Sequence, residues 1–240
     1  MNQILADRLK RLQDSIADAC GRAGRPEKSV RLVVVTKTAP PEAVKEVIRL
    51  GCTELGENRA QRLKPIAEEI DLFLKDNAAD PALPKQVHWH MIGHLQRNKV
   101  KTTLKYSQII HSVDTLRLAE EINTCAYNRG LHIDVLLQVN CSGEPQKYGV
   151  PVGAAMYLAE QIATMPNLRL VGLMTMAPLT MDKDRVRACF ARAREIFEDI
   201  RAEKIVSAKF KHLSMGMSQD YELAIEEGAT MLRIGSALFA

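Results

Sequence analysis

The feature that most restricts the fold of this chain is a regular alternation of strand-like and helix-like segments over almost its whole length. Apolar, β-branched runs typical of strands lie near residues 31–37, 53–56, 87–91, 108–111, 133–140, 168–174, 209–213 and 230–234. Helical patterns lie near residues 3–23, 41–50, 58–70, 95–104, 114–129, 152–164, 182–203 and 218–227. The strands recur about every 29 residues, close to the roughly 30 residues of one βα unit. We therefore predict a single α/β domain over residues 1–240, a (β/α)₈ TIM barrel with an extra N-terminal helix.

Chain length and the first strand agree with this prediction. The chain has 240 residues, and barrels of this kind typically have about 250. Residues 31–35 are apolar on both faces apart from Arg31, which is typical of a strand buried in a parallel sheet. Residues 72–86, which contain several Asp, Asn and Pro residues, are expected to form a surface insertion. An open, doubly wound sheet is the alternative arrangement of the same elements.

Charge and cysteine content limit the class of protein. The 33 Lys and Arg residues exceed the 29 Asp and Glu residues by only four, and the two signs are interspersed, so we expect no nucleic-acid partner. No apolar run approaches the about 20 residues of a membrane span, and the N-terminal residues lack the pattern of a signal peptide. Five scattered cysteines form no paired motif, which is typical of reduced thiols. We expect a cytoplasmic protein without membrane contact.

A lysine stands where the first predicted strand ends. In a barrel, the active site lies at the carboxyl ends of the strands, where Lys37 is placed. An amine at the end of an apolar strand is expected to be partly shielded from water, which favours its use as a nucleophile toward a carbonyl. The competing interpretation is a surface lysine whose side chain reaches into solvent.

The ends of the last two predicted strands are suited to hold a phosphate. Barrel phosphate sites are often formed by the loops after strands 7 and 8. Here those loops begin with Ser214-Met215-Gly216 and with Gly235-Ser236, which offer hydroxyl groups and backbone N–H groups. Ser218 is expected to be the N-cap of the helix over residues 218–227. Ordinary turn chemistry at both places is the alternative.

Buried polar residues complete the candidates. Arg233 lies within an apolar strand, so it is either part of a structural ion pair or a donor to a bound cofactor. His88 and His90 share one face of a strand, and a metal site is conceivable there, although packing or hydrogen bonding explains them better. The sequence contains no G-x-S-x-G, G-x-G-x-x-G or Walker lysine motif that would indicate a serine hydrolase or a nucleotide-binding protein.

Several of these segments together resemble a known family, the pyridoxal phosphate homeostasis proteins. The segments are Thr36-Lys37-Thr38, Leu55-Gly56-Glu57-Asn58, Trp89-His90-Met91-Ile92-Gly93-His94, Val139-Asn140-Cys141-Ser142-Gly143, Leu213-Ser214-Met215-Gly216-Met217-Ser218 and Arg233-Ile234-Gly235-Ser236. The resemblance covers about residues 5–239. It implies a single barrel of the alanine racemase N-terminal type that binds pyridoxal 5′-phosphate (PLP).

The resemblance also implies a role for individual residues. Lys37 would hold PLP as a Schiff base, and Asn58 would lie beside the ring. Arg233 would face the pyridine nitrogen. The phosphate would be held by Ser214, the backbone around Met215, and Gly235 with Ser236. An arginine at the ring nitrogen keeps that nitrogen unprotonated, which makes the ring a poorer electron sink.

The function that the resemblance implies is PLP (vitamin B6) homeostasis without an established catalytic turnover. Racemases of this fold use a second base from another domain, and we expect no such domain in a chain that ends shortly after its last strand. The expected partners are PLP and the PLP-dependent apo-enzymes that would receive it, and the expected state is a monomer. The alternative is a PLP-dependent racemase or lyase with weak activity, and a metal-dependent hydrolase is a third hypothesis.

Overall fold

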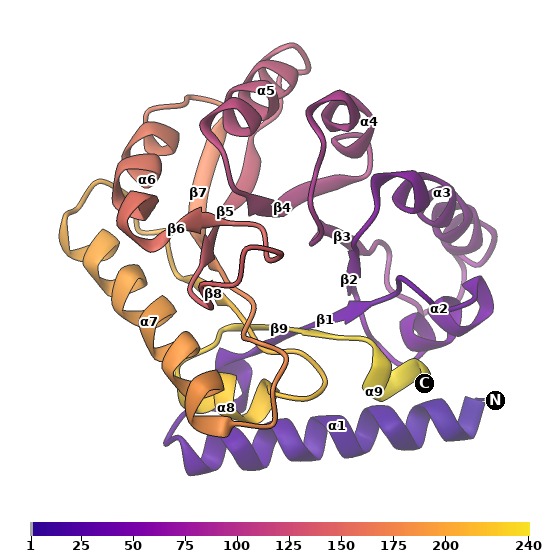
Figure 1. The fold of residues 1–240 in the computed structure, drawn as a ribbon. Helices are drawn as coiled ribbons and strands as arrows, with labels where there is room; N and C mark the ends of the chain where they lie inside the picture. Colours follow the sequence, from indigo (N-terminus) through magenta and orange to yellow (C-terminus); the bar gives the residue numbers. More distant parts are fainter. Residues whose placement is uncertain (1) are drawn as a thin grey trace.

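The computed structural model describes residues 2–240 and has a closed barrel of parallel strands at its centre (Figure 1). The barrel strands are β1 (Arg31–Val35), β2 (Glu54–Glu57), β3 (His88–Met91), β4 (Ser107–Val113), β5 (Ile133–Asn140), β7 (Leu168–Met174), β8 (His212–Ser214) and β9 (Met231–Ile234). They follow one another around the barrel in this order, and β9 pairs with β1 to close it. The predicted TIM barrel is confirmed, and the open sheet is wrong because β4 also pairs with β5.

Helices surround the barrel, as Figure 1 shows. They are α1 (Asn2–Arg22), α2 (Pro41–Arg49), α3 (Ala60–Asp76), α4 (Val100–Thr103), α5 (Leu116–Tyr127), α6 (Ala155–Ala163), α7 (Lys183–Ala202), α8 (Tyr221–Glu226) and α9 (Ser236–Phe239). Short 3-10 turns lie at Glu27–Ser29, Arg97–Lys99 and Val152–Ala154. None of the helices in the described part of the chain has the length and apolar character needed to cross a membrane.

Some predicted boundaries are wrong, each for a local reason. The segment expected as one helix over 95–104 is a 3-10 turn followed by the single turn of α4. Helix α3 extends to Asp76, so the surface insertion starts after it, because residues 72–76 continue the helix despite their polarity. Two short elements are absent from the prediction: α9, and β6 (Val150–Pro151), which pairs with the end of β5. Elements of two to four residues are too short to produce a periodic pattern.

Most of the apolar core lies between the strands and the helices, and the barrel interior holds both apolar and polar side chains. The large core cluster contains outward-facing residues of the strands, such as Val34, Leu232 and Ile234. Inside the barrel, a small apolar cluster is formed by Leu136, Val171 and Met174. The rest of the interior is therefore available for the polar side chains described below.

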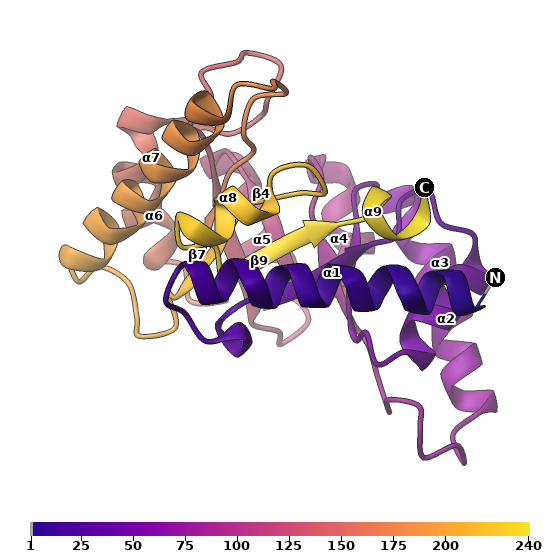
Figure 2. The same cartoon turned by 90° about the horizontal axis from the view of Figure 1, so that it is seen from below.

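Helix α1 packs along the outside of the barrel against α8 and α9 (Figures 1 and 2). Its buried residues recur at three- and four-residue intervals, which places them on one face: Leu5, Leu9, Leu12, Ile16 and Ala19. Beyond its end, Arg25 donates hydrogen bonds to the carbonyl oxygens of Ile225 and Ala229 at 2.7 and 2.8 Å. The extra N-terminal helix predicted from the sequence thus covers the part of the barrel formed by the last elements of the chain.

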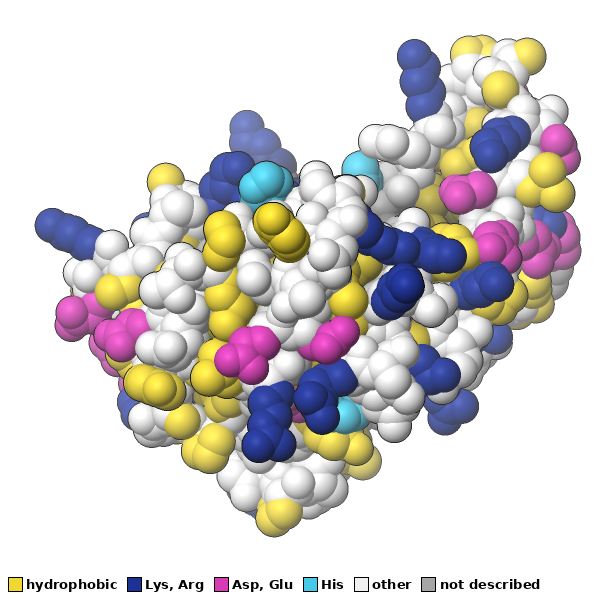
Figure 3. Space-filling model, turned by 90° about the horizontal axis from the view of Figure 1, so that it is seen from above, with side chains coloured by type: hydrophobic (Ala, Val, Ile, Leu, Met, Phe, Trp, Pro, Cys, Tyr) yellow, Lys and Arg dark blue, Asp and Glu magenta, His cyan; other side chains and the backbone are white. Residues whose placement is uncertain are grey.

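The two ends of the barrel carry different loops. Figure 2 shows the loop over residues 77–87 at one end, and the loops over 141–149 and 175–182 at the opposite end. The first loop leads into the amino end of β3, whereas the other two follow the carboxyl ends of β5 and β7. On the face shown in Figure 3, Lys and Arg side chains lie interspersed with Asp and Glu side chains.

Candidate functional site

The seven residues predicted as a binding site all belong to four neighbouring strands or the loops that follow them. Strands β8, β9, β1 and β2 are adjacent in the barrel. In the β1–β2 register Val35 lies opposite Gly56, so Lys37 and Asn58 leave the two strands side by side. In the β1–β9 register Val34 lies opposite Ile234, which places Gly235 beside Val35. The structure thus brings the ends of all four segments together at one edge.

Lys37 is exposed, so the partial burial expected from its position is wrong. The reason is that β1 ends at Val35 and the chain turns outward directly after the buried Thr36. This turn is held by Arg62 of α3, which donates hydrogen bonds to the carbonyl oxygens of Thr36 and Ala39. The backbone that carries Lys37 is therefore fixed on both sides while its amine remains accessible.

A buried carboxylate supports the same turn. Glu57 is fully buried at the end of β2 and accepts hydrogen bonds from the Thr36 hydroxyl at 2.6 Å and from the Arg62 Nε at 3.2 Å. Burial raises the pKa of Glu57, although both donors act against this rise. The sequence places Glu57 at a strand end, but only the tertiary structure shows that it contacts Thr36 and Arg62.

Close backbone contacts shape the ends of β9 and β2. A Cβ atom on Gly235 would lie 2.8 Å from the carbonyl oxygen of Val35, and one on Gly93 would lie 2.1 Å from the carbonyl oxygen of Asn58. Asn58 itself is half-buried. Gly235 therefore lets β9 approach the carboxyl end of β1 without a side chain between them, while the Ser236 side chain is exposed at the start of α9.

The loop after β8 differs in part from what the sequence predicts. The N–H of Met215 donates to the carbonyl oxygen of Met231 at 3.1 Å, so it extends the sheet. Gly216 has a φ of 91°, a conformation that favours glycine, and among residues 2–240 its N–H meets no acceptor. Within Ser214-Met215-Gly216, the N–H of Gly216 is thus available to a ligand.

Ser218 is not the N-cap of the following helix. Helix α8 begins at Tyr221, because the side chain of Asp220 accepts a hydrogen bond from the N–H of Met217 at 2.6 Å and closes a turn first. The hydroxyl of Ser218 instead accepts a hydrogen bond from the N–H of Ala237 at 3.1 Å. Ser218 therefore connects the loop after β8 to α9, which follows β9, and holds the two predicted phosphate loops together.

Ser214 and Arg233 contact one another inside the barrel. The Nη1 of Arg233 donates to the Ser214 Oγ at 2.7 Å, and its Nη2 donates to the carbonyl oxygen of Thr175 at 2.9 Å. Both side chains are buried, and none of the described carboxylates lies within 4.0 Å of the guanidinium, so a structural ion pair is not formed. Burial lowers the pKa of Arg233 to about 10.

Two histidines extend this contact into a chain of hydrogen bonds across the barrel. The Ser214 Oγ lies 2.9 Å from the Nδ1 of His111, whose Nε2 lies 2.8 Å from the Nδ1 of His90. The Nε2 of His90 lies 2.6 Å from the Oε2 of Glu54. The chain starts at Arg233 near the carboxyl ends of the strands and reaches Glu54, the first residue of β2, at the amino ends.

Every donor in this row of hydrogen bonds meets an acceptor when all of the bonds run from Arg233 toward Glu54. Arg233 can only donate, so Ser214 accepts from it and donates to His111. His111 then donates to His90, and His90 donates to Glu54, if both imidazoles are neutral. Burial lowers the pKa of His111 well below its ordinary value and also lowers that of His90, which favours this neutral form.

Burial raises the pKa of Glu54, but the hydrogen bond from His90 and the nearby Arg31 outweigh it and leave the carboxylate ionised. The row of hydrogen bonds thus has a positive charge on Arg233 at one end and a negative charge on Glu54 at the other. The neutral histidines and Ser214 between them supply hydrogen-bond partners to both charged groups.

The histidine pair that suggested a metal site has other roles. His88 is exposed, whereas His90 is buried and uses both ring nitrogens in the chain just described. No group of three or more His, Cys, Asp or Glu side chains suited to hold a metal ion occurs among residues 2–240. His111 and Thr175 stand at predicted strand ends but are not among the predicted binding residues. In the structure β4 continues to Val113, so His111 lies within the strand. The signal for His111 is a histidine within a buried apolar strand, which requires a hydrogen-bond partner.

We expect the stability of the fold to decrease as the pH falls from about 6.5 toward 4. Burial, together with the charges of Arg31 and Lys211, lowers the pKa of His212 in the folded state to about 4. Its ordinary value is about 6.5, so in this interval the unfolded chain binds a proton that the folded chain does not. The stability gained from neutral His212 is complete above pH 6.5 and is lost as the pH falls to about 4.

Urea unfolding at several pH values checks this expectation. The variant His212→Asn removes the titrating group while keeping a side chain that can form hydrogen bonds. As the pH falls from about 6.5 to about 5, the urea concentration at the unfolding midpoint should decrease less for the variant than for the parent protein. Equal decreases in both proteins would show that His212 does not contribute.

Comparison with known proteins agrees with the fold. The model of the family described as "Alanine racemase, N-terminal domain" matches residues 8–240. The "Pyridoxal phosphate homeostasis protein" of Aquifex aeolicus is 41% identical over 233 residues, which are 97% of this chain and 96% of that protein.

Two solved structures are also similar. The crystal structure of "an unknown protein from Bifidobacterium adolescentis" is 36% identical with a TM-score of 0.92, over 99% of this chain and 95% of that one. The structure of PipY from Synechococcus elongatus, solved with PLP bound, is 32% identical with a TM-score of 0.80, over 98% of this chain and 100% of PipY. With these similarities over nearly its whole length, the chain belongs to the family of pyridoxal phosphate homeostasis proteins, and its barrel is of the alanine racemase N-terminal type.

Proposed function

We propose that this protein binds PLP at the carboxyl ends of β8, β9, β1 and β2, and that it serves intracellular PLP (vitamin B6) homeostasis without catalytic turnover. The observation that carries the proposal is the buried guanidinium of Arg233, which has no carboxylate partner among residues 2–240. Arg233 lies on β9, which pairs with β1, the strand that leads to the Lys37 turn. A buried cation of this kind requires an acceptor. The relative solved with PLP bound supports the same ligand.

The groups at this edge fit PLP because they are donors or nucleophiles, and PLP presents acceptors. When bound, PLP supplies an aldehyde carbon with which an amine can form a covalent bond. We assign this amine to the exposed Lys37, on the turn that Arg62 holds in place. Asn58 leaves β2 beside Lys37 and would contact the ring.

The remaining residues would hold the two other ends of the ligand. The N–H of Gly216 and the Gly235-Ser236 turn would bind the phosphate. Ser214 and Met215 would act mainly by fixing this loop, since the hydroxyl of Ser214 and the N–H of Met215 have partners within the protein. Arg233 would donate to the pyridine nitrogen, and a permanent cation there disfavours protonation of that nitrogen.

This arrangement supports a carrier more than an enzyme. A ring nitrogen that stays unprotonated stabilises a carbanion poorly, so catalysis of proton abstraction from an amino acid is disfavoured. We propose that the protein acts as a cytoplasmic monomer that holds PLP and releases it to PLP-dependent apo-enzymes.

The test is a pair of measurements on the PLP-loaded protein. Mixed with the apo form of a PLP-dependent enzyme, it should restore that enzyme's activity. Incubated with L- or D-alanine in deuterated water, it should leave the Cα–H signal of the amino acid unchanged. Loss of that signal in a manner dependent on Lys37 would instead establish the alternative, a racemase or lyase. Failure of the protein to take up PLP at all would contradict the proposal.

A further inference from the structure

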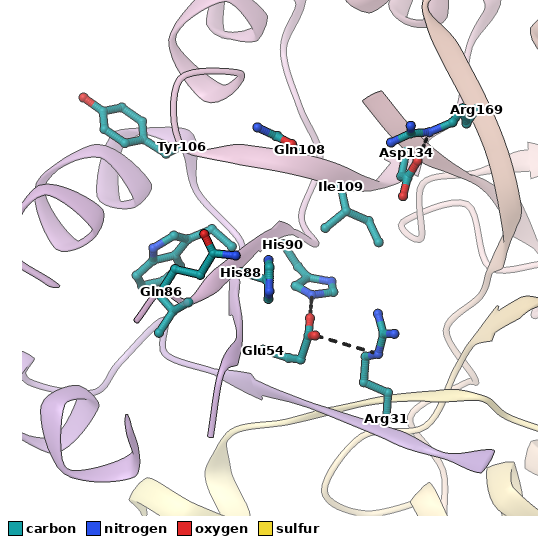
Figure 4. A pocket seen from close by; sticks show the side chains of 12 residues that line it. Arg31, Glu54, Gln86, His88, His90, Tyr106, Gln108, Ile109, Asp134 and Arg169 are labelled. Carbon is teal, nitrogen blue, oxygen red and sulfur yellow. Dashed lines mark hydrogen bonds and ion pairs between the residues drawn. The ribbon is translucent and has the colours of Figure 1, made fainter. Parts of the chain in front are cut away.

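A second polar pocket lies at the opposite end of the barrel from the proposed PLP site. It has a volume of about 450 Å³ and is formed where the strands begin (Figure 4). Arg31, Glu54 and His88 are the first residues of β1, β2 and β3, and Asp134 and Arg169 are the second residues of β5 and β7. Pockets of this volume are within the range that binds small molecules.

Two arginines of this pocket have donors without partners. The Nε of Arg31 lies 3.9 Å from the Glu54 Oε1, which is beyond hydrogen-bond distance, and within residues 2–240 its guanidinium meets no hydrogen-bond acceptor. Arg169 donates from Nε to Asp134 and from Nη2 to the carbonyl oxygen of His132, so its Nη1 remains available. In Figure 4 the guanidinium groups of Arg31 and Arg169 both point into the pocket.

The carboxylates of the pocket are already used. Glu54 accepts the hydrogen bond from His90 that ends the interior chain, at 2.6 Å, and Asp134 accepts from Arg169. Arg31 faces Glu54 as an ion pair at 3.9 Å without a hydrogen bond, and its charge contributes to the low pKa of His212 nearby. Any anion that enters the pocket meets cations whose donors are not satisfied by the protein.

Trp89 borders the pocket and is 4% exposed. Its side chain leaves β3 on the face opposite His88 and His90 and packs in the large core cluster. The donors that a ligand in the pocket can reach are thus those of Arg31 on β1 and Arg169 on β7.

We propose that this pocket binds a small dicarboxylate of the size of succinate. Arg31 and Arg169 stand on strands β1 and β7, which are separated by β9 and β8, so their guanidinium groups reach the pocket from different strands. A ligand with a carboxylate at each end meets both guanidinium groups, and pairs of this kind are strong, charge-assisted hydrogen bonds. The site lies apart from the proposed PLP site, because it is formed by the amino ends of the strands.

Trp89 is the only tryptophan of the chain and borders this pocket, so its fluorescence is a probe of ligand binding there. The experiment titrates the full-length protein with succinate at constant ionic strength, once without PLP and once loaded with PLP, and isothermal titration calorimetry repeats the titration. We expect a saturable change in Trp89 emission. Acetate, which has one carboxylate, should bind at least about tenfold more weakly.

Variants identify the residues involved. Arg31→Gln should weaken succinate binding at least about tenfold, and Arg169→Lys should weaken it as well while keeping a cation beside Asp134. The control Arg97→Gln changes an exposed arginine outside this pocket and should bind succinate as the parent protein does.

Absence of a saturable signal in the parent protein would overturn the proposal, whether or not either variant folds. Equal binding by Arg31→Gln, or acetate binding as tight as that of succinate, would also overturn it. A protein that binds succinate but takes up no PLP would contradict only the function proposed above.

Discussion

Replacing Lys37 by alanine is expected to abolish the covalent attachment of PLP. Lys37 is the amine carried by the turn that follows β1, and Arg62 holds this turn through two backbone carbonyl groups. Without the amine, the visible absorbance band of the PLP-loaded protein should be lost completely. PLP should then dissociate on dialysis, because only the phosphate and ring contacts remain.

The stability of the PLP-free protein should change little in this variant. Lys37 is exposed, and exposed substitutions usually alter the free energy of unfolding by no more than about 0.5 kcal/mol. The matched control is Lys105→Ala, since Lys105 is exposed in the segment between α4 and β4. If the absorbance band survives in Lys37→Ala, the assignment of the covalent bond to Lys37 is contradicted.

Replacing Gly172 by alanine is expected to destabilise the barrel by about 3 kcal/mol or more. Gly172 lies in β7 opposite His212 in β8, and a Cβ atom there would be 1.7 Å from the carbonyl oxygen of His212. The clash is with backbone, so no side chain can rotate away, and the two strands must separate. Because β8 also carries Ser214, the contact with Arg233 should weaken at the same time.

Urea unfolding followed by far-UV circular dichroism measures this effect. The control is Gly153→Ala, since Gly153 is exposed and has no atom within 4 Å of a Cβ built on it. That substitution should change the free energy of unfolding by no more than about 0.5 kcal/mol. If both variants lose stability equally, the close approach of β7 and β8 at Gly172 does not exist in solution.

The polar chain inside the barrel distinguishes this protein from barrels that are filled by apolar layers. Interior layers of TIM barrels are usually dominated by branched apolar residues. Here His90, His111 and Ser214 occupy part of that space, and their polar groups have partners within the chain. A buried network in which every member is satisfied is rigid, and it fixes the position of Arg233. The result is a guanidinium held in one orientation below the edge where Lys37 emerges.

The sequence by itself determined the fold, because long-range structure followed from local patterns. Apolar β-branched runs near every thirtieth residue specify strands buried on both faces, and only a barrel or a doubly wound sheet buries them all. The strand ends then identified Lys37, Asn58, Gly235 and Ser236 as neighbours at one edge. That inference needs only the rule that parallel strands end on the same side.

The tertiary structure decided which side chains contact one another. Whether β4 pairs with β5 to close the barrel depends on the twist accumulated over all strands, and no local pattern records it. The hydrogen bond between His111 and Ser214 joins residues 103 positions apart on β4 and β8. The exposure of Lys37 depends on a turn held by Arg62. Glu54 is hydrogen-bonded to His90, and among residues 2–240 the donors of Arg31 have no hydrogen-bond acceptor. Such contacts depend on distances across the barrel, which the sequence does not encode locally.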